Sequence, residues 1–250
     1  CFLKRDNGSW TGALDELQEI TEEAWRSKIY NKPGRPTVDR GHVHAKYSPA
    51  LQQIRQPCTV NDLAGADLRA TARGWATWKA GGLDGWSAQQ FKELPEEHFD
   101  WLAQMLNAIE QEGDCEWPQT CVDGNMVMIP KASGAQDPLG QRPITLMSLA
   151  YRAWSTTRAR QCAEWMRSWA PSFLTGGVPG RGPEDTWAPL AVRAEIARLE
   201  GSGLAGLSVD LYKYFDLVDP LMAVGFLEDL GLDERVSRGL RKMYAHHRRF

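Results

Sequence analysis

At 250 residues, with 42% hydrophobic and 24% charged residues, the chain can form one large domain or two small ones and has an ordinary globular composition. No apolar run approaches the roughly 20 residues of a membrane span and no signal peptide opens the chain, so we expect no membrane partner and an intracellular location, cytoplasmic or nuclear. The formal net charge is only −3, so the placement of the charges says more about partners than their sum does.

The charges are unevenly placed along the chain. Residues 125–170 carry six basic and two acidic residues, and residues 235–250 carry six basic residues and no acid. Two basic zones in a near-neutral protein favour a polyanion bound over part of the surface. The alternative is a pair of helices with solvated basic faces.

Five cysteines are scattered without a CxxC pair. An odd number at irregular spacing indicates a reducing compartment and argues against a disulfide framework or a zinc site. The chain begins with Cys and stops inside a basic helical pattern, so we expect it to be a piece of a longer polypeptide, a polyprotein with further parts.

Helices dominate the first hundred residues. Apolar spacing predicts an amphipathic helix over residues 12–30 and a second from Asn61, a plausible N-cap, to about Lys79. Between them, Pro, Gly and basic residues predict a loop or linker over residues 31–57, in which His42 and His44 have a structural or solvent role. Residues 81–86 read as a turn, and Pro95 begins a helix that continues to about Gly113.

A hairpin carrying two cations follows. Met126 to Ile129 predict a strand that ends in Pro130-Lys131, and Arg142 begins a returning strand after a polar loop over residues 132–141. Cations so placed can neutralise phosphate oxygens, arginine through its fork and lysine as a point charge.

The second half alternates helices with one apolar strand. We expect helices over residues 146–169, 183–199, 221–230 and 234–247. The glycine-rich stretch 176–182 is a plain connection and not a Walker A loop, because no Lys-Ser/Thr pair follows it. The fold class is therefore α+β, helix-rich with a small antiparallel sheet.

Residues 204–209 predict a buried strand that runs directly into Asp210. A carboxylate at the end of such a strand lies at the sheet edge, where it can be an oxygen ligand for Mg²⁺. The alternative is an ordinary Asp-rich turn, because Asp216 and Asp219 follow closely.

The order of the sequence blocks resembles the reverse transcriptase domain of non-LTR retrotransposons and group II intron-like elements. The resemblance runs from about residue 60 to the C-terminus. The matching blocks are GLDGW (82–86), VMIPK (127–131), QRPITLMSLAYR (141–152), PGRGPEDT (179–186) and VDLYKYFDLVDP (209–220).

The resemblance implies a right-hand polymerase fold. In this view residues 1–60 are an N-terminal helical extension and linker, residues 61–203 the fingers and their connection, and residues 204–250 the start of the palm. The implied partners are an RNA template, a DNA primer and dNTPs.

The resemblance also implies the site residues. Asp210 matches the first catalytic aspartate, which with the backbone carbonyl of Leu211 would bind two Mg²⁺ ions for nucleotidyl transfer. Phe215 matches the gate that excludes a ribose 2′-hydroxyl, and Lys131 and Arg142 match the cations that hold the triphosphate. Residues expected to bind nucleic acid are the basic side chains Arg152, Arg158, Arg181, Arg241 and Lys242.

Three departures qualify this expectation. Gly176-Gly177 stands where the family has Gly-Phe, and residues 212–215 read Tyr-Lys-Tyr-Phe where Ser-Lys-Ala-Phe is usual. No adjacent Asp-Asp pair occurs, so the family's later palm strand has no counterpart in these residues. We therefore expect this chain alone to be inactive as an RNA-directed DNA polymerase.

Three alternatives remain. The chain is a degenerate remnant that binds nucleic acid without chemistry, or a helical protein-interaction domain, or part of an RNA-dependent RNA polymerase. Phe215 argues against the last of these, because its ring would exclude ribonucleotides.

Overall fold

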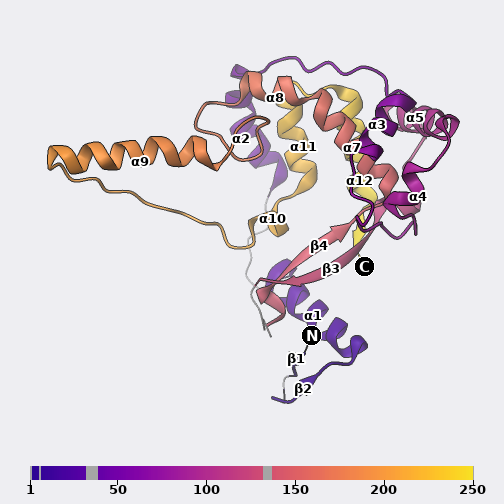
Figure 1. Cartoon of the computed structure of the whole chain (residues 1–250), viewed down its shortest axis with the longest axis horizontal. Coiled ribbons are helices and arrows are strands. Elements are labelled where there is room, and N and C mark those ends of the chain that lie inside the picture. Colours follow the sequence, from indigo (N-terminus) through magenta and orange to yellow (C-terminus); the bar gives the residue numbers. More distant parts are fainter. Residues whose placement is uncertain (1, 6, 32–38, 132–136, 250) are drawn as a thin grey trace.

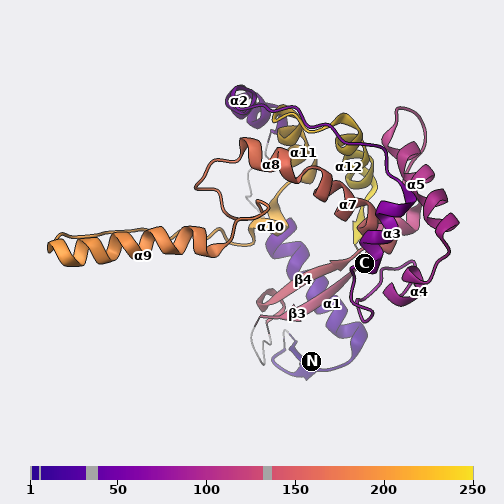
Figure 2. The same cartoon turned by 45° about the horizontal axis from the view of Figure 1, so that its top comes forward.

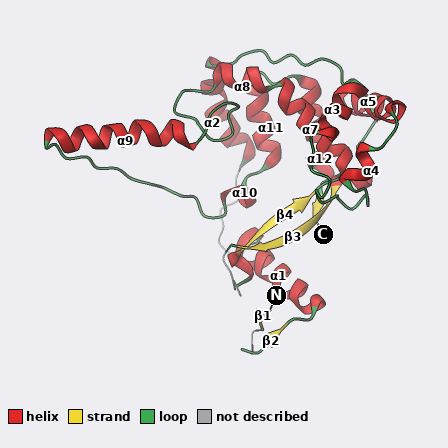
Figure 3. Ribbon diagram, in the orientation of Figure 1, coloured by secondary structure: helices red, strands yellow, loops and turns green. Residues whose placement is uncertain are grey.

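The computed structural model describes residues 2–5, 7–31, 39–131 and 137–249. Helices are its main elements, and the strands form two small sheets (Figure 3). The helical elements are α1 (Leu14–Trp25) with a π-helical continuation η1 (Arg26–Tyr30), α2 (Arg40–Gln53), α3 (Gly65–Arg73), α4 (Ala88–Lys92), α5 (Glu96–Glu110), α6 (Gln119–Val122), the 3₁₀ turn η2 (Pro138–Gly140), α7 (Leu149–Gln161), α8 (Ala163–Trp169), α9 (Pro183–Glu200), α10 (Tyr214–Leu217), α11 (Pro220–Asp229) and α12 (Glu234–His246).

The strands are short. They are β1 (Leu3–Lys4), β2 (Trp10–Thr11), β3 (Asp123–Pro130), β4 (Gln141–Leu146) and β5 (Arg248–Arg249). β1 and β2 pair antiparallel, and the second sheet has the order β4-β3-β5, with β3–β4 antiparallel and β3–β5 parallel. The α+β class and the antiparallel hairpin are thus confirmed.

The body of the molecule is a helical core beside this hairpin (Figure 1). The side chains that fill it come from α3, α5, α7 and α12, whose apolar faces meet because their apolar residues recur every three or four positions. Its fully buried members include Leu68, Phe99, Leu106, Trp154 and Met243. A second cluster joins residues 58–60 to α8 and the α11–α12 turn.

One buried charge pair lies inside this core. The guanidinium of Arg158 pairs with the carboxylate of Glu110, which also accepts a hydrogen bond from Trp154 Nε1 at 2.6 Å. Arg158 Nη1 reaches further, to the backbone oxygen of Asn61 at 2.6 Å. Charges removed from water in this way need complete pairing, and here each has it.

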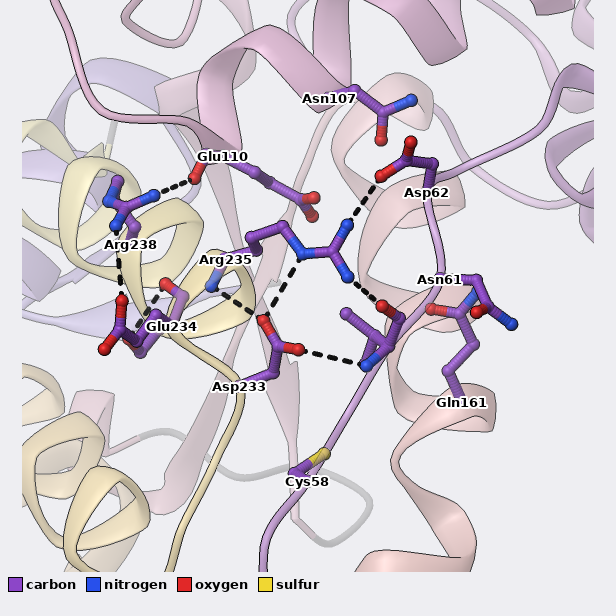
Figure 4. A network of polar contacts seen from close by, with 12 residues as sticks. Cys58, Asn61, Asp62, Asn107, Glu110, Gln161, Asp233, Glu234, Arg235 and Arg238 are labelled. Atoms are coloured by element: carbon purple, nitrogen blue, oxygen red, sulfur yellow. Dashed lines mark hydrogen bonds and ion pairs between the residues drawn. The ribbon is translucent and has the colours of Figure 1, made fainter.

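A polar network holds the approach to α3 against the start of α12 (Figure 4). Asp233 accepts a hydrogen bond from Val60 N at 3.0 Å, and Arg235 bonds Asp62 at 2.6 Å as well as the Val60 carbonyl. Residues 58–62 are therefore held by the C-terminal helix, so contacts cross the expected boundaries at residues 60 and 203. The three-part division stays a prediction.

Most predicted helices are present. The helix over residues 12–30 is α1 with η1, the helix after Pro95 is α5, and the last three are α9, α11 and α12. The turn at residues 81–86 is also found, with Gly85 N donating to Gly82 O at 3.3 Å.

The expected loop over residues 31–57 is wrong in its second half, where α2 forms. Its polarity and Pro49 hid it, because the helix is stabilised by packing on α11 rather than by its own apolar stripe. His44 lies 2.9 Å from Asp229 and stacks on Phe226, which gives it a structural role.

Two further boundaries differ. The expected helix 146–169 begins only after Ser148, whose hydroxyl caps α7 by accepting from Tyr151 N at 3.1 Å, and it is interrupted at Cys162. Asn61 does not cap α3, which begins at Gly65 and ends at Arg73 rather than near Lys79.

The expected buried strand over residues 204–209 is the largest error. The segment has no regular structure and is exposed throughout, and it returns from α9, which projects from the body (Figures 1 and 2). An apolar strand forms only where a neighbouring strand pairs with it, and in the described residues no strand pairs with this segment, although β4 is an edge strand of the sheet.

Within the residues that the structure describes, no helix is both long enough and apolar enough to cross a membrane.

Candidate nucleotide and nucleic-acid site

The hairpin β3–β4 places two cations on one face. Ile129 lies opposite Arg142, and the turn closes with Lys131 N donating to Gly140 O at 3.1 Å. Directly opposed residues share a face and residues two apart repeat it, so Lys131 continues the face of Arg142. Both side chains are exposed. The predicted loop between them falls partly on residues 132–136, which lie outside the described residues.

The segment that carries Asp210 is tethered to this hairpin by Lys213. Its ammonium donates to the carbonyls of Leu139 at 2.9 Å and Gln141 at 3.5 Å, and it lies 4.0 Å from the ring centre of Trp25. Lys213 has a left-handed backbone, with φ of 51°, which turns the chain from the exposed segment into α10. Sequence reasoning missed Lys213, although it is the one cation between Asp210 and Asp216.

The pKa of Lys213 reflects its position beside the hairpin. Partial burial lowers the pKa of Lys213, and the positive charge of Lys131 lowers it further, while Asp216 and Asp137 oppose the shift. Lys213 and Lys131 thus belong to one electropositive end of the hairpin.

Asp210 and Phe215 flank this tether and face solvent. Asp210 is exposed, and the Phe215 ring is 91% exposed with its edge against Tyr214 at 5.6 Å. The Leu211 carbonyl accepts a hydrogen bond from Tyr214 N at 3.3 Å.

This donor set does not fit two magnesium ions. Within the ranges that the structure describes, no three His, Cys, Asp or Glu side chains come together in a way that could hold a metal. Asp210 offers one exposed carboxylate beside the Leu211 carbonyl, whereas a two-ion centre needs several oxygen ligands around each ion.

A cavity of about 960 Å³ lies on the other side of the hairpin. Its lining includes Met126 and Met128 from β3, Trp25 from α1, and Asp216. Because these methionines alternate with Val127 and Ile129, they lie on the opposite face from Arg142. The cavity and the two cations therefore occupy different faces of the hairpin.

The basic residues expected to bind nucleic acid differ in how far their side chains are exposed to solvent. For Arg158 the expectation is wrong, because its side chain is only 2% exposed and pairs with Glu110. Arg181 donates to the carbonyls of Ala170 at 2.9 Å and Leu174 at 2.8 Å, which holds the 176–182 connection against α8.

The C-terminal basic zone is largely engaged within the protein. Arg241 pairs with both carboxylate oxygens of Glu228, which raises the pKa of the arginine and lowers that of the glutamate. Lys242 donates to the carbonyls of Gly113 at 3.1 Å and Cys115 at 2.8 Å. These cations of α12 are therefore bonded within the protein, which differs from the solvated basic face that was the alternative to a polyanion site.

Arg152 is the remaining member of the set. Its Nη1 donates to Ala80 O at 2.5 Å, and its guanidinium lies 5.7 Å from the ring centre of Trp75. It therefore belongs to the surface near the 81–86 turn, away from the other predicted residues.

Two curated proteins are similar to this chain. A retrovirus-related Pol polyprotein from the type-1 retrotransposable element R2 of Nasonia vitripennis is 22% identical over 229 residues, which cover 87% of this chain and 21% of that protein. The transposon TX1 uncharacterized 149 kDa protein of Xenopus laevis is 25% identical over 194 residues, which cover 78% of this chain and 14% of that protein.

No family model matches the chain. The chain spans about a fifth or less of the length of these two relatives, at 21% and 14%. The similarity covers most of the present residues, and on this basis the chain is a distant relative of retrotransposon proteins.

Proposed function

We propose that this chain is the fingers and the first part of the palm of a retroelement RNA-directed DNA polymerase. It would contact an RNA template, a DNA primer and an incoming dNTP, in the cytoplasm or nucleus. Lys131 and Arg142 would hold the triphosphate, and Phe215 would select against the ribose 2′-hydroxyl.

The observation that carries the proposal is the tether between the two parts of the site. Lys213 connects the Asp210–Phe215 segment to the end of the hairpin on which Lys131 and Arg142 lie. A triphosphate needs cations close to the polymerising carboxylate, and the Lys213 hydrogen bond joins the segment that carries Asp210 to the hairpin that carries these cations, 74 residues earlier in the chain. The distant retrotransposon relatives support the same reading.

In this proposal two magnesium ions need ligands beyond Asp210 and the Leu211 carbonyl. The chain alone is therefore expected not to extend a primer. Primer extension by residues 1–250 with Mg²⁺ and dNTPs measures this directly. Any templated product would contradict the expectation, and in a longer native protein that does extend primers Asp210→Ala should abolish the activity.

Nucleotide binding tests the cations. A fluorescent dATP analogue with Mg²⁺ should bind the wild-type chain, and Lys131→Ala and Arg142→Ala should each weaken binding by about tenfold, since each removes a charge-assisted phosphate contact. Lys46→Ala, an exposed lysine on α2, is the matched control. Equal binding by all four proteins would reject the triphosphate assignment.

A remnant that binds nucleic acid without chemistry is the second candidate. The single exposed carboxylate, without further metal-ligating side chains in the described ranges, favours it. It predicts salt-sensitive binding of an RNA·DNA hybrid together with no binding of the dATP analogue. Binding of the analogue that depends on Lys131 would exclude this candidate.

A further inference from the structure

The loop between α3 and α4 forms a second site, apart from the hairpin. An open hollow of about 420 Å³ is lined by residues 77–82 and 85–87. The loop lies between α3 and α4, at the end of the molecule opposite to α9 (Figures 1 and 2).

The backbone of this loop is closely packed rather than loose. A Cβ on Gly81 would lie 2.0 Å from the Trp86 carbonyl oxygen, and one on Gly82 would lie 2.6 Å from the Met147 carbonyl carbon. Only glycine allows these approaches, and they fix the loop against itself and against the start of α7. The hollow is therefore a preformed shape.

Two indole rings border the hollow. Trp78 is 88% exposed, and Trp86 is partly exposed with its edge packed against Phe91 at 6.4 Å. The Trp78 ring is therefore accessible to a ligand, and an indole combines a large apolar surface with a polar N–H. Each ring offers a flat face to a planar ligand.

Two cations lie along the same loop, since Lys79 lines the hollow and Arg152 donates to the Ala80 carbonyl. Lys79 and Arg152 lie over the same Trp75 ring, 5.5 and 5.7 Å from its centre. Burial lowers the pKa of both groups, and the pKa of Lys79 is lowered further by the charge of Arg152. In the part of the chain that the structure describes, neither cation forms an ion pair, although the Asp84 carboxylate acts on Arg152 through space.

Asp84 is the carboxylate nearest to this pair. Its Oδ2 accepts a hydrogen bond from Leu149 N at 3.1 Å, which directs it to the start of α7. It acts on Arg152 only through space and does not occupy the guanidinium. The carboxylate therefore fixes the loop and offsets part of the charge of Arg152 without forming an ion pair with it.

We propose that this loop binds unpaired nucleotides, with a base stacked on Trp78 and the neighbouring phosphate held by Lys79 and Arg152. A single strand presents unstacked planar bases joined by phosphates, which suits an exposed indole on a loop that also carries Lys79 and holds Arg152. A duplex keeps its internal bases stacked on one another and offers a base face to Trp78 only at its two ends. The site does not depend on Asp210 or on the hairpin, so it goes beyond the proposed polymerase function.

Fluorescence anisotropy with labelled 20-nucleotide strands tests the site without primer or dNTP. Trp78→Ala should weaken binding roughly 5- to 100-fold, the range that stacking on an aromatic side chain produces. Trp78→Phe should recover most of the affinity, because a phenyl ring still stacks. Lys79→Ala should weaken binding and reduce the slope of log K against log salt by about 0.7.

Trp101→Ala is the matched control. Trp101 is an exposed indole on α5 whose ring tilts over His98 instead of lying beside a cation. The Trp101→Ala protein should bind the labelled strands as tightly as the wild type does. Wild-type affinity in Trp78→Ala, or an equal loss in Trp101→Ala, would overturn the proposal.

Separate arms use DNA, RNA and a blunt duplex. Binding of either single strand that exceeds duplex binding supports the site, and the ratio of RNA to DNA affinity identifies its ligand. Preference for the duplex would overturn it. Loss of nucleotide-analogue binding in Lys131→Ala with intact strand binding would separate this site from the proposed polymerase function.

Discussion

The helical body and the arm formed by α9 with residues 201–212 contain the same kinds of residue in opposite surroundings. Leu68 and Leu106 are fully buried in the body, whereas Leu199 and Leu207 in the arm are largely exposed. α9 buries none of its residues, although it is the longest helix that the structure describes. An apolar residue contributes stability only where other elements cover it, so pattern alone does not decide burial.

Charge pairs show the same contrast. Glu110 and Arg158 form a pair inside the core, and Glu195 and Arg198 form one on the exposed surface of α9. The first pair has lost its water and depends on complete pairing, whereas the second is screened by solvent.

The largest expected effect comes from breaking the buried pair. Arg158→Ala leaves the Glu110 carboxylate buried without its partner and should lower the free energy of unfolding by about 3–5 kcal/mol. Arg198→Ala should change it by less than about 0.5 kcal/mol. Urea denaturation followed by circular dichroism measures both. Similar losses in the two variants would mean that the arm is packed in solution.

Truncating a leucine in each region gives the next largest difference. Leu106→Ala opens a cavity in the core and should cost about 2–5 kcal/mol. Leu207→Ala removes an exposed side chain and should cost less than about 0.5 kcal/mol. The same denaturation experiment applies, and a cost above 2 kcal/mol for Leu207→Ala would show that this segment is covered.

Lys213→Met tests how the arm is attached to the hairpin. The variant loses the hydrogen bonds to the Leu139 and Gln141 carbonyls, worth about 1–2 kcal/mol together. Hydrogen exchange of residues 210–217, followed by mass spectrometry, should become several-fold faster while α5 is unchanged. Lys46→Met on α2 is the control. Unchanged exchange in Lys213→Met would show that Lys213 does not hold this segment against the hairpin.

The smallest effect concerns the buried cysteines. Cys162 lies 3.7 Å from Cys58, and burial together with that neighbour raises the pKa of the Cys162 thiol from 9.0 to about 12. At pH 8 iodoacetamide should modify the exposed Cys115 well before Cys162, because only the thiolate reacts. Peptide mass spectrometry gives both rates, and equal rates would contradict the buried environment.

The same thiol has a consequence for stability. The folded state holds the Cys162 proton more tightly than the unfolded state does. The stabilisation of the folded state by this thiol is therefore complete below pH 9 and is lost as pH rises from about 9 to 12. Cys162→Ala should show a smaller decline in melting temperature over that range than the wild type does. An identical decline would assign the pH dependence to other groups.

Part of the site followed from local sequence. Met126 to Ile129 form a short apolar run followed by Pro130 and a polar loop, and this pattern was sufficient to predict the hairpin that carries Lys131 and Arg142. The tether could not be predicted, because the ammonium of Lys213 bonds backbone carbonyls 74 and 72 residues earlier in the chain. The basic residues were predicted by charge alone, which does not distinguish the buried Arg158 from the exposed Lys131.

The amino-acid sequence by itself determined the helices α1, α5, α11 and α12 and the β3–β4 hairpin, because their apolar periodicity and turn residues act over short distances. Only the tertiary structure decided which apolar side chains are buried and which charged side chains are paired. It formed α2 by packing it on α11, left residues 204–209 exposed, and neutralised Arg158 and Arg241 with distant carboxylates. Burial and pairing depend on neighbours from other parts of the sequence, and a local sequence pattern does not identify those neighbours.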